Sequence, residues 1–217
     1  MKKTNYHTHS TFCDGKNTPE EVVKAALQKG FDALGFSSHS MYPFSSDWHL
    51  ASREHSDYAA EVRRLQKEYK NQLDIKLGFE ADFIEGVCAP KMDRFQEFNP
   101  DYLIGAVHYV PGKKGFIEAD GSKESVLEGI KNHFDGDAKK AVQEYFYLER
   151  QMLKTCDFTI IAHCDLIQKQ NGPKAGKPLF DEASAWYKDE ITLLAREISR
   201  AGVVAEVNVG GMSRGYM

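Results

Sequence analysis

Histidines and acidic residues stand where short apolar runs end in this chain of 217 residues. The pair His7 and His9 lies in the first strand candidate, at residues 4–10, and Asp14 lies in the loop just after it. Within a strand, residues i and i+2 point to the same side, so both imidazoles could reach one metal ion. Imidazole nitrogen and carboxylate oxygen suit Zn, Fe and Mn. The pattern therefore indicates a metal site.

Four further strand candidates end in a residue that can bind a metal. These residues are His39, Glu80, His108 and His163. A single HxH pair is weak evidence, because such histidines are more often surface or core residues, and a lone histidine at a strand end is more often structural. Donors at five separate strand ends are harder to explain by composition. We therefore favour a metal cluster over chance.

Strand and helix patterns alternate along the chain, and this arrangement would bring the donors together. Strands are predicted at residues 4–10, 33–36, 75–80, 102–108, 158–163 and 203–208, and helices at 18–30, 52–69, 137–154 and 183–200. The first helix has a clear start, with Thr18 as N-cap, Pro19 at the first helical position and Glu21 completing a capping box. Strands separated by helices indicate a parallel sheet. In a parallel barrel the carboxyl ends of all strands meet at one face.

The stretches between these elements are interpreted as loops at residues 41–50, 112–125 and 168–178. No pair of strands carries a hairpin signal, so closure into a barrel is plausible. Three histidines outside the strand ends, His49, His55 and His133, are interpreted as ordinary solvated residues. Of these, His49 is the one most expected to differ, because it lies in a loop that follows a strand.

Composition excludes several other classes of protein. The net charge is −4 and the charged residues are interspersed, which argues against a nucleic-acid footprint and against a polybasic membrane patch. No apolar run approaches the roughly 20 residues of a membrane span. The four cysteines form no CxxC pair and indicate reduced thiols in the cytoplasm. One domain over residues 1–217 is the expectation for this length.

Together these segments resemble the PHP (polymerase and histidinol phosphatase) family, and within it the histidinol-phosphate phosphatases. The resemblance is carried by His7-Thr8-His9-Ser10 with Asp14-Gly15, Ser38-His39, Gly78-Phe79-Glu80-Ala81-Asp82, Gly105-Ala106-Val107-His108, Ile161-Ala162-His163-Cys164-Asp165-Leu166-Ile167 and Glu206-Val207-Asn208. It extends over essentially the whole chain. It implies an α/β fold, a distorted (β/α)7 barrel, and a site with three divalent metal ions.

The resemblance also implies a role for each donor. The ligands would be His7 and His9 for the first metal, Glu80 bridging the first and second, His108 and His163 for the second, and Asp14 and His39 for the third. Glu80, His108 and His163 would stand closest to the chemistry. The implied reaction is hydrolysis of a small phosphate ester, L-histidinol phosphate, in histidine biosynthesis. A phosphate dianion needs charge neutralisation and a strong nucleophile, and adjacent metal ions supply both.

One family motif is absent from this sequence. Family members carry a late Asp-x-His on the seventh strand, which supplies an aspartate to the first metal and a histidine to the third. No such motif follows Asn208, and the sequence stops at Met217. We expect a truncated chain that lacks the last strand and helix; the other interpretation is a shortened natural protein with impaired metal binding. An uncovered strand edge would favour a homo-oligomer.

Contacts to the substrate are predicted from loops that follow strands. Arg214 could bind phosphate through its guanidinium or could be a flexible terminal residue. Asp165, like Asp82, could orient a ligand histidine, meet a cationic amine of the substrate or cap a helix. Ser10 and Asn208 could donate hydrogen bonds to phosphate or substrate.

Two other functions stay open. The chain could hydrolyse another ester, such as a phosphotyrosine or a nucleotide. It could also be a metal-binding protein without activity, because the last motif is missing.

Overall fold

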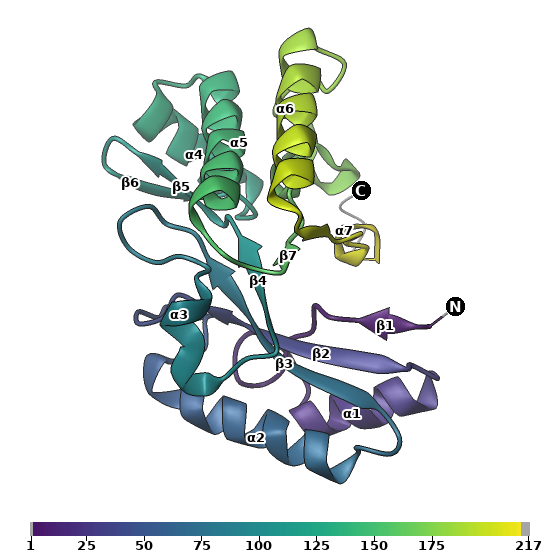
Figure 1. Cartoon of the computed structure of the whole chain (residues 1–217). Helices are drawn as coiled ribbons and strands as arrows, with labels where there is room; N and C mark the ends of the chain where they lie inside the picture. Colours follow the sequence, from purple (N-terminus) through teal and green to yellow (C-terminus); the bar gives the residue numbers. More distant parts are fainter. Residues whose placement is uncertain (1, 214–217) are drawn as a thin grey trace. The chain divides into compact units, whose positions relative to one another are not determined.

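The computed structural model describes residues 2–213, which form two compact units. The first unit comprises the chain up to Gly105 together with Asp157–Ile160, and the second comprises Ala106–Cys156 and the chain from Ile161 onward. The strand order of the main sheet is β1-β2-β3-β4-β7-β8. Alternation of these strands with helices confirms the predicted α/β class (Figure 1).

The first unit contains four neighbouring strands. They are β1 (Thr4–Asn5), β2 (Ala33–Ser40), β3 (Asp74–Asp82) and β4 (Tyr102–Ala106). β2 pairs in parallel with both β1 and β3, as predicted for strands joined by helices. All eight residues of β2 are buried, so the polar residues Ser37, Ser38, His39 and Ser40 are buried together with the apolar run at residues 33–36. In the register between β2 and β3, His39 lies opposite Glu80.

Two helices of the first unit connect its strands. α1 (Pro19–Gln28) begins at the predicted capping box of Thr18 and Glu21, and Gly30 follows it with a φ of +67°. α2 (His55–Glu68) follows the 3-10 turn η1 (Ser52–Glu54) and packs on β3, burying Tyr58, Val62 and Leu65. The unit also contains α3 (Met92–Phe95) and η2 (Gln96–Phe98).

Tyr102 fixes the start of the site from inside the first unit. Its ring lies over Gly35 and Gly78, where an added Cβ would come within 2.3 Å and 2.4 Å of the ring or its hydroxyl. The hydroxyl lies 2.5 Å from the carbonyl oxygen of Tyr6 and 3.0 Å from that of Phe36. Glycine at both positions therefore lets a buried tyrosine hold the chain just before His7.

The second unit is mainly helical (Figure 1). Its elements are β5 (Tyr109–Gly112), β6 (Gly115–Glu118), α4 (Lys123–Phe134), α5 (Ala138–Thr155), β7 (Ile160–Ile161, which begins at the end of the first unit), η3 (Leu166–Asn171), η4 (Pro173–Ala175), α6 (Ala185–Ala201), β8 (Val204–Ala205) and α7 (Gly210–Ser213). α5 packs against α6, and an ion pair of 2.6 Å joins Arg150 to Glu190 between them.

The segment at residues 112–125 is only partly a loop, because it contains a strand and the start of a helix, and the absence of a hairpin was a wrong prediction. β5 and β6 form an antiparallel hairpin in which Gly112 pairs with Gly115, and α4 begins at Lys123. The two glycines flank the turn instead of occupying it, so the usual Asn-Gly or Asp-Gly signal is missing. α4 buries only Val126 and Ile130, which is too sparse a stripe to stand out in the sequence.

Three strands are much shorter than predicted. β1, β7 and β8 each have two residues, although six or seven residues were predicted for each. Both residues of β1 and both residues of β8 are exposed, so the sequence of these two segments indicated neither burial nor the extent of backbone pairing. Within residues 2–213, no helix is long and apolar enough to cross a membrane.

Candidate metal centre

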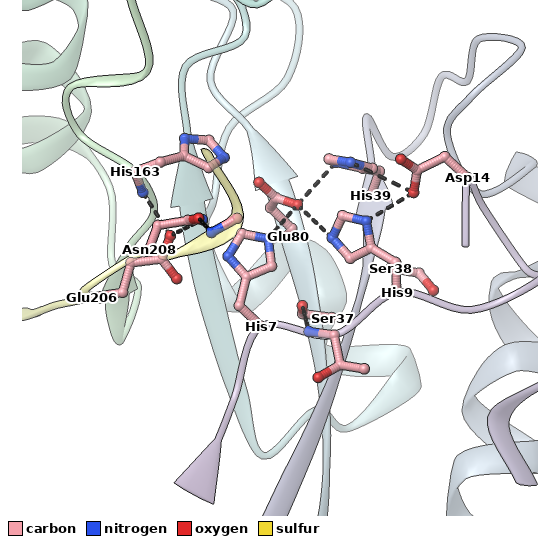
Figure 2. A network of polar contacts seen from close by, with 12 residues as sticks. His7, His9, Asp14, Ser37, Ser38, His39, Glu80, His163, Glu206 and Asn208 are labelled. Carbon is pink, nitrogen blue, oxygen red and sulfur yellow. Dashed lines mark hydrogen bonds and ion pairs between the residues drawn. The ribbon is translucent and has the colours of Figure 1, made fainter. Parts of the chain in front are cut away.

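Glu80 is the central carboxylate of the candidate site in the first unit. Its side chain is fully buried at 0% exposure. A single oxygen, Oε2, lies 2.9 Å from His7 Nε2, 2.9 Å from His9 Nε2 and 2.9 Å from His39 Nδ1 (Figure 2). A buried carboxylate needs compensating charge or hydrogen bonds, and three imidazoles converge here to supply them.

Strand pairing explains why these side chains meet. His39 stands opposite Glu80 in the β2–β3 register. The segment after β1 keeps contact with β2, since the amide of Thr8 donates to Ser37 Oγ (3.1 Å) and the amide of Ser37 donates to the Thr8 carbonyl (2.9 Å). His7 and His9 flank Thr8 and therefore both point toward Glu80, as the i and i+2 spacing predicted, although β1 itself ends at Asn5.

Asp14 approaches the same imidazoles from their other side. Its Oδ1 lies 2.8 Å from His9 Nδ1 and 3.8 Å from His39 Nε2. A tight turn brings it there, in which the Ser10 carbonyl accepts from the amides of Cys13 and Gly15, both at 3.0 Å. An added Cβ at Gly15 would lie 2.4 Å from the Ser10 amide, so only glycine fits this turn.

The charges in this cluster shift two protonation equilibria. Burial by itself lowers the pKa of His9, but hydrogen bonds to Asp14 and Glu80 outweigh it, so that the pKa is raised above its usual value of 6.5. Burial opposes ionisation of Asp14, yet the hydrogen bond from His9 and the charges of His9 and His39 hold its pKa well below its usual range. The cluster therefore favours a cation between its carboxylates.

Replacing Asp14 by asparagine should lower the pKa of the His9 imidazole in the metal-free protein. The variant removes the negative charge of Asp14 and leaves at most a neutral hydrogen bond to His9, while burial, which lowers the pKa of His9, remains. A proton NMR titration of the histidine ring signals would measure the shift. Asp57→Asn, at an exposed position of α2, is the matched control and should leave His9 unchanged. An unchanged His9 pKa in the Asp14 variant would contradict the contact.

The donor set fits a divalent metal. Two groups of three residues in the first unit each offer ligand atoms within 4.8 Å of one another: His7, His9 and Glu80, and His9, Asp14 and His39. A bound cation could take the place of protons between these imidazoles and the two carboxylates. Nitrogen and carboxylate oxygen in this proportion suit Zn, Mn or Fe.

Histidines of the second unit form another pair. The rings of His108 and His163 lie 5.1 Å apart between centroids. The amide of His163 donates to Glu206 Oε1 at 2.7 Å, and Asn208 Nδ2 donates to the same oxygen at 3.0 Å (Figure 2). The structure therefore assigns Glu206, which the sequence had marked only as part of a family segment, to holding the backbone of His163. The Asn208 amide is engaged locally on both sides, because its Oδ1 accepts from Gly210 at 2.8 Å.

Glu149 of α5 is a buried acid that the sequence interpretation missed. Its exposure is 0%, and the Tyr145 hydroxyl lies 2.8 Å from its Oε1 and 3.3 Å from the carbonyl oxygen of His163. Burial, opposed by the Tyr145 hydrogen bond and the charge of His108, raises the pKa of Glu149 from 4.5 to about 8. An acidic residue on the apolar stripe of a helix, four residues after Tyr145, was the available signal.

The remaining predicted contact residues lie in varied places. Ser10 is fully buried, and its hydroxyl accepts from the Phe12 amide at 3.4 Å. Asp165 is half-buried at the start of η3 and does not cap it through its side chain. Arg214 lies outside the described residues. The four cysteines are free thiols.

Two of the three histidines set aside as solvated are not solvated. His55 is fully buried and its Nε2 lies 2.7 Å from Ser40 Oγ. His49, the expected exception, is buried and its Nε2 lies 2.5 Å from Asp82 Oδ2. Asp82 therefore orients a histidine outside the predicted ligand set. The sequence could not reveal either burial, because each partner is distant along the chain.

Known proteins are similar to this chain. It is 30% identical over 171 residues to a protein of Deinococcus radiodurans and 26% identical over 227 residues to one of Schizosaccharomyces pombe, both named "Probable histidinol-phosphatase". These matches cover 75% and 97% of this chain, but only 60% and 70% of the relatives. The chain thus spans about three fifths of the length of the first of them.

Two solved structures share the fold. A candidate histidinol phosphatase from Listeria monocytogenes matches with a TM-score of 0.83 at 21% identity, over 97% of this chain and 84% of that one. A histidinol phosphate phosphatase from Lactococcus lactis, solved with Zn, L-histidinol and phosphate, matches with a TM-score of 0.66 at 21% identity, over 96% and 73%. The predicted fold type is confirmed by both.

The family model described as the PHP domain matches residues 5–209. This range includes the Glu80 cluster, the His108 and His163 pair, and the Glu206 and Asn208 contacts. The matched range therefore takes in every described donor predicted from the strand ends. The chain belongs to the PHP domain family.

Proposed function

We propose that this chain is a metal-dependent phosphomonoesterase that hydrolyses L-histidinol phosphate to L-histidinol and phosphate. The observation that carries the proposal is the buried Glu80 oxygen, 2.9 Å from each of three imidazole nitrogens. Family membership and relatives named as histidinol phosphatases support the substrate. The reaction would serve histidine biosynthesis in the cytoplasm.

The metal ligands would be the predicted set. In the first unit these are His7, His9, Asp14, His39 and Glu80, and in the second His108 and His163. When bound, divalent cations supply Lewis acidity toward phosphate oxygens and toward a water molecule. Zn is supported by the ion in the Lactococcus protein. Mn and Fe suit the same donors, and three ions per complete protein is our expectation.

The residues of the chain itself contribute position and charge. Glu80 and Asp14 would bring two negative charges to the imidazoles from opposite sides, which fixes the orientation of the His9 ring at both nitrogens. Tyr145 and Glu206 hold the backbone of His163 on its carbonyl and amide sides. Our proposed substrate contacts remain Asp165, Ser10, Asn208 and Arg214. To contact the substrate, Asn208 must give up one of its local hydrogen bonds.

A substrate panel tests the proposal. The full chain, stripped with a chelator and reloaded with Zn or Mn, should release phosphate from L-histidinol phosphate faster than from phosphotyrosine or a nucleoside monophosphate. Activity should disappear on chelation and return with metal. Turnover of another ester without turnover of L-histidinol phosphate would overturn the substrate. Metal binding without hydrolysis of any ester would overturn the enzymatic role.

A further inference from the structure

The segment between β2 and η1, residues 41–51, is anchored by buried imidazoles that the metal cluster does not use. At its end, His55 Nε2 lies 2.7 Å from Ser40 Oγ, and its Nδ1 lies 3.1 Å from the Ala51 carbonyl. In its middle, His49 Nε2 lies 2.5 Å from Asp82 Oδ2 and its Nδ1 lies 2.6 Å from Ser46 Oγ. The segment is therefore held in a defined conformation.

His49 is placed as a support, because among the described residues it belongs to no group of converging metal donors. Its side chain is 0% exposed and that of Asp82 is 1% exposed. With Asp82 as acceptor, Nε2 carries a proton, and Nδ1 can accept from the Ser46 hydroxyl. Both ring nitrogens are then engaged with protein groups. His49 therefore acts through the residues that it positions.

Trp48 is the neighbour that this support positions. Its indole lies against the His49 ring at a tilt, with centroids 3.7 Å apart and an angle of 32° between the planes. It also meets His39 edge-on, with centroids 4.7 Å apart and planes at 89°. His39 in turn lies 2.9 Å from the Glu80 carboxylate. A half-buried indole thus borders the candidate metal centre from within the same unit.

The segment also returns to the strand that carries His39. The amide of Leu50 donates to the His39 carbonyl at 2.9 Å. Trp48 therefore lies between two fixed points, the adjacent His49 ring and the end of β2. An indole held rigidly beside a reactive centre presents a surface that is favourable to cations and to planar rings.

We propose that Trp48 is a specificity residue that forms the wall of the subsite for the alcohol half of the phosphate ester. The subsite would take a planar, cationic group, and under the proposed function this group is the imidazole and ammonium of L-histidinol. The inference rests on that proposed function. His49, Asp82 and Ser46 act through Trp48 and are positioning residues.

Kinetics on two esters test the role of Trp48 in the metal-loaded full chain. Trp48→Ala should raise KM for L-histidinol phosphate about tenfold, the loss expected for one contact between a cation and an indole. KM for glycerol 2-phosphate, which has neither a ring nor a cation, should stay unchanged, as should the metal content. The KM of the Trp48→Phe variant for L-histidinol phosphate should lie between those of the native protein and the alanine variant. Trp186→Ala is the matched control, because it is the other, also half-buried tryptophan.

A binding measurement separates this inference from the catalytic proposal. In a Trp186→Phe background Trp48 is the only tryptophan, so its fluorescence reports on the subsite directly. L-histidinol should change the emission saturably, and glycerol should not. Three results would overturn the inference. They are an equal rise in KM for both esters with Trp48→Ala, a fall in metal content with the same variant, and no change of emission with L-histidinol. Saturable binding in a chain that hydrolyses no L-histidinol phosphate would support the subsite and reject the proposed function.

Discussion

Replacing Glu80 by glutamine should abolish most of the metal binding and, with it, phosphatase activity. Loss of a residue that only orients a metal ligand commonly costs about 10- to 100-fold, so a carboxylate shared by three imidazoles should cost about 1000-fold or more. Glutamine keeps the shape of the side chain but removes the negative charge that His7, His9 and His39 face at 2.9 Å. The measurements are metal content after dialysis and the rate of phosphate release.

Glu85→Gln provides the matched control, since this residue is exposed shortly after β3. It should bind metal and turn over substrate as the native chain does. Circular dichroism of both variants would show that the fold is retained. If the Glu80 variant retained the native metal content and activity, Glu80 would be a structural acid and the metal centre would lie elsewhere.

Much of this cluster could be predicted from the sequence because β2 and β3 are long, buried strands. Each contains a recognisable apolar run, so the donors that follow these runs, His39 and Glu80, are easily recognised as neighbours at one edge. The His7 and His9 pair was predicted to converge because residues i and i+2 of a strand point to the same side. The sequence could not predict that all three imidazoles would share one carboxylate oxygen, because this depends on the turn at Gly15 and on the position of Tyr102.

Burial of polar side chains was the poorest part of the prediction. His49 and His55 lie in polar sequence, yet both are buried by partners on other elements, Asp82 on β3 and Ser40 at the end of β2. Such pairings depend on tertiary packing and leave no periodic signal. Glu149 differs, because it occupies the apolar stripe of α5 and a charged residue there conflicts with the helical pattern.

The hydrogen bonds around Glu149 favour one protonation state of its carboxyl group. The Tyr145 hydroxyl has one proton but lies within reach of two acceptors, Glu149 Oε1 and the His163 carbonyl. A neutral carboxyl group can donate to the Tyr145 oxygen, which frees the tyrosine proton for His163. An ionised carboxylate would compete with His163 for that proton, and among residues 2–213 its Oε2 has no hydrogen-bond partner. Both arguments favour the neutral acid and agree with a pKa of about 8.

Glu149→Gln should therefore remove a pH-dependent loss of stability in the metal-free protein. The folded pKa of about 8 lies above the ordinary value of 4.5, so between these values the folded state binds more protons than the unfolded state. Folding stability then falls as pH rises through this window. Because one pKa unit corresponds to about 1.4 kcal/mol, titration of Glu149 should lower the free energy of unfolding of the native chain by about 2 to 5 kcal/mol across this window.

Urea unfolding at pH 5.5 and pH 8.5 with chelator present would measure the effect, since a glutamine amide can donate to Tyr145 as the neutral acid does but does not titrate. The variant should match the native chain at the lower pH and exceed its stability at the higher one. Glu128→Gln, exposed on α4, should follow the native pH dependence. If the native chain and the Glu149 variant lost the same stability between pH 5.5 and pH 8.5, the Glu149 carboxyl group would be ionised in the folded protein. The contact from Tyr145 to His163 would then have to compete with a buried charge for a single proton.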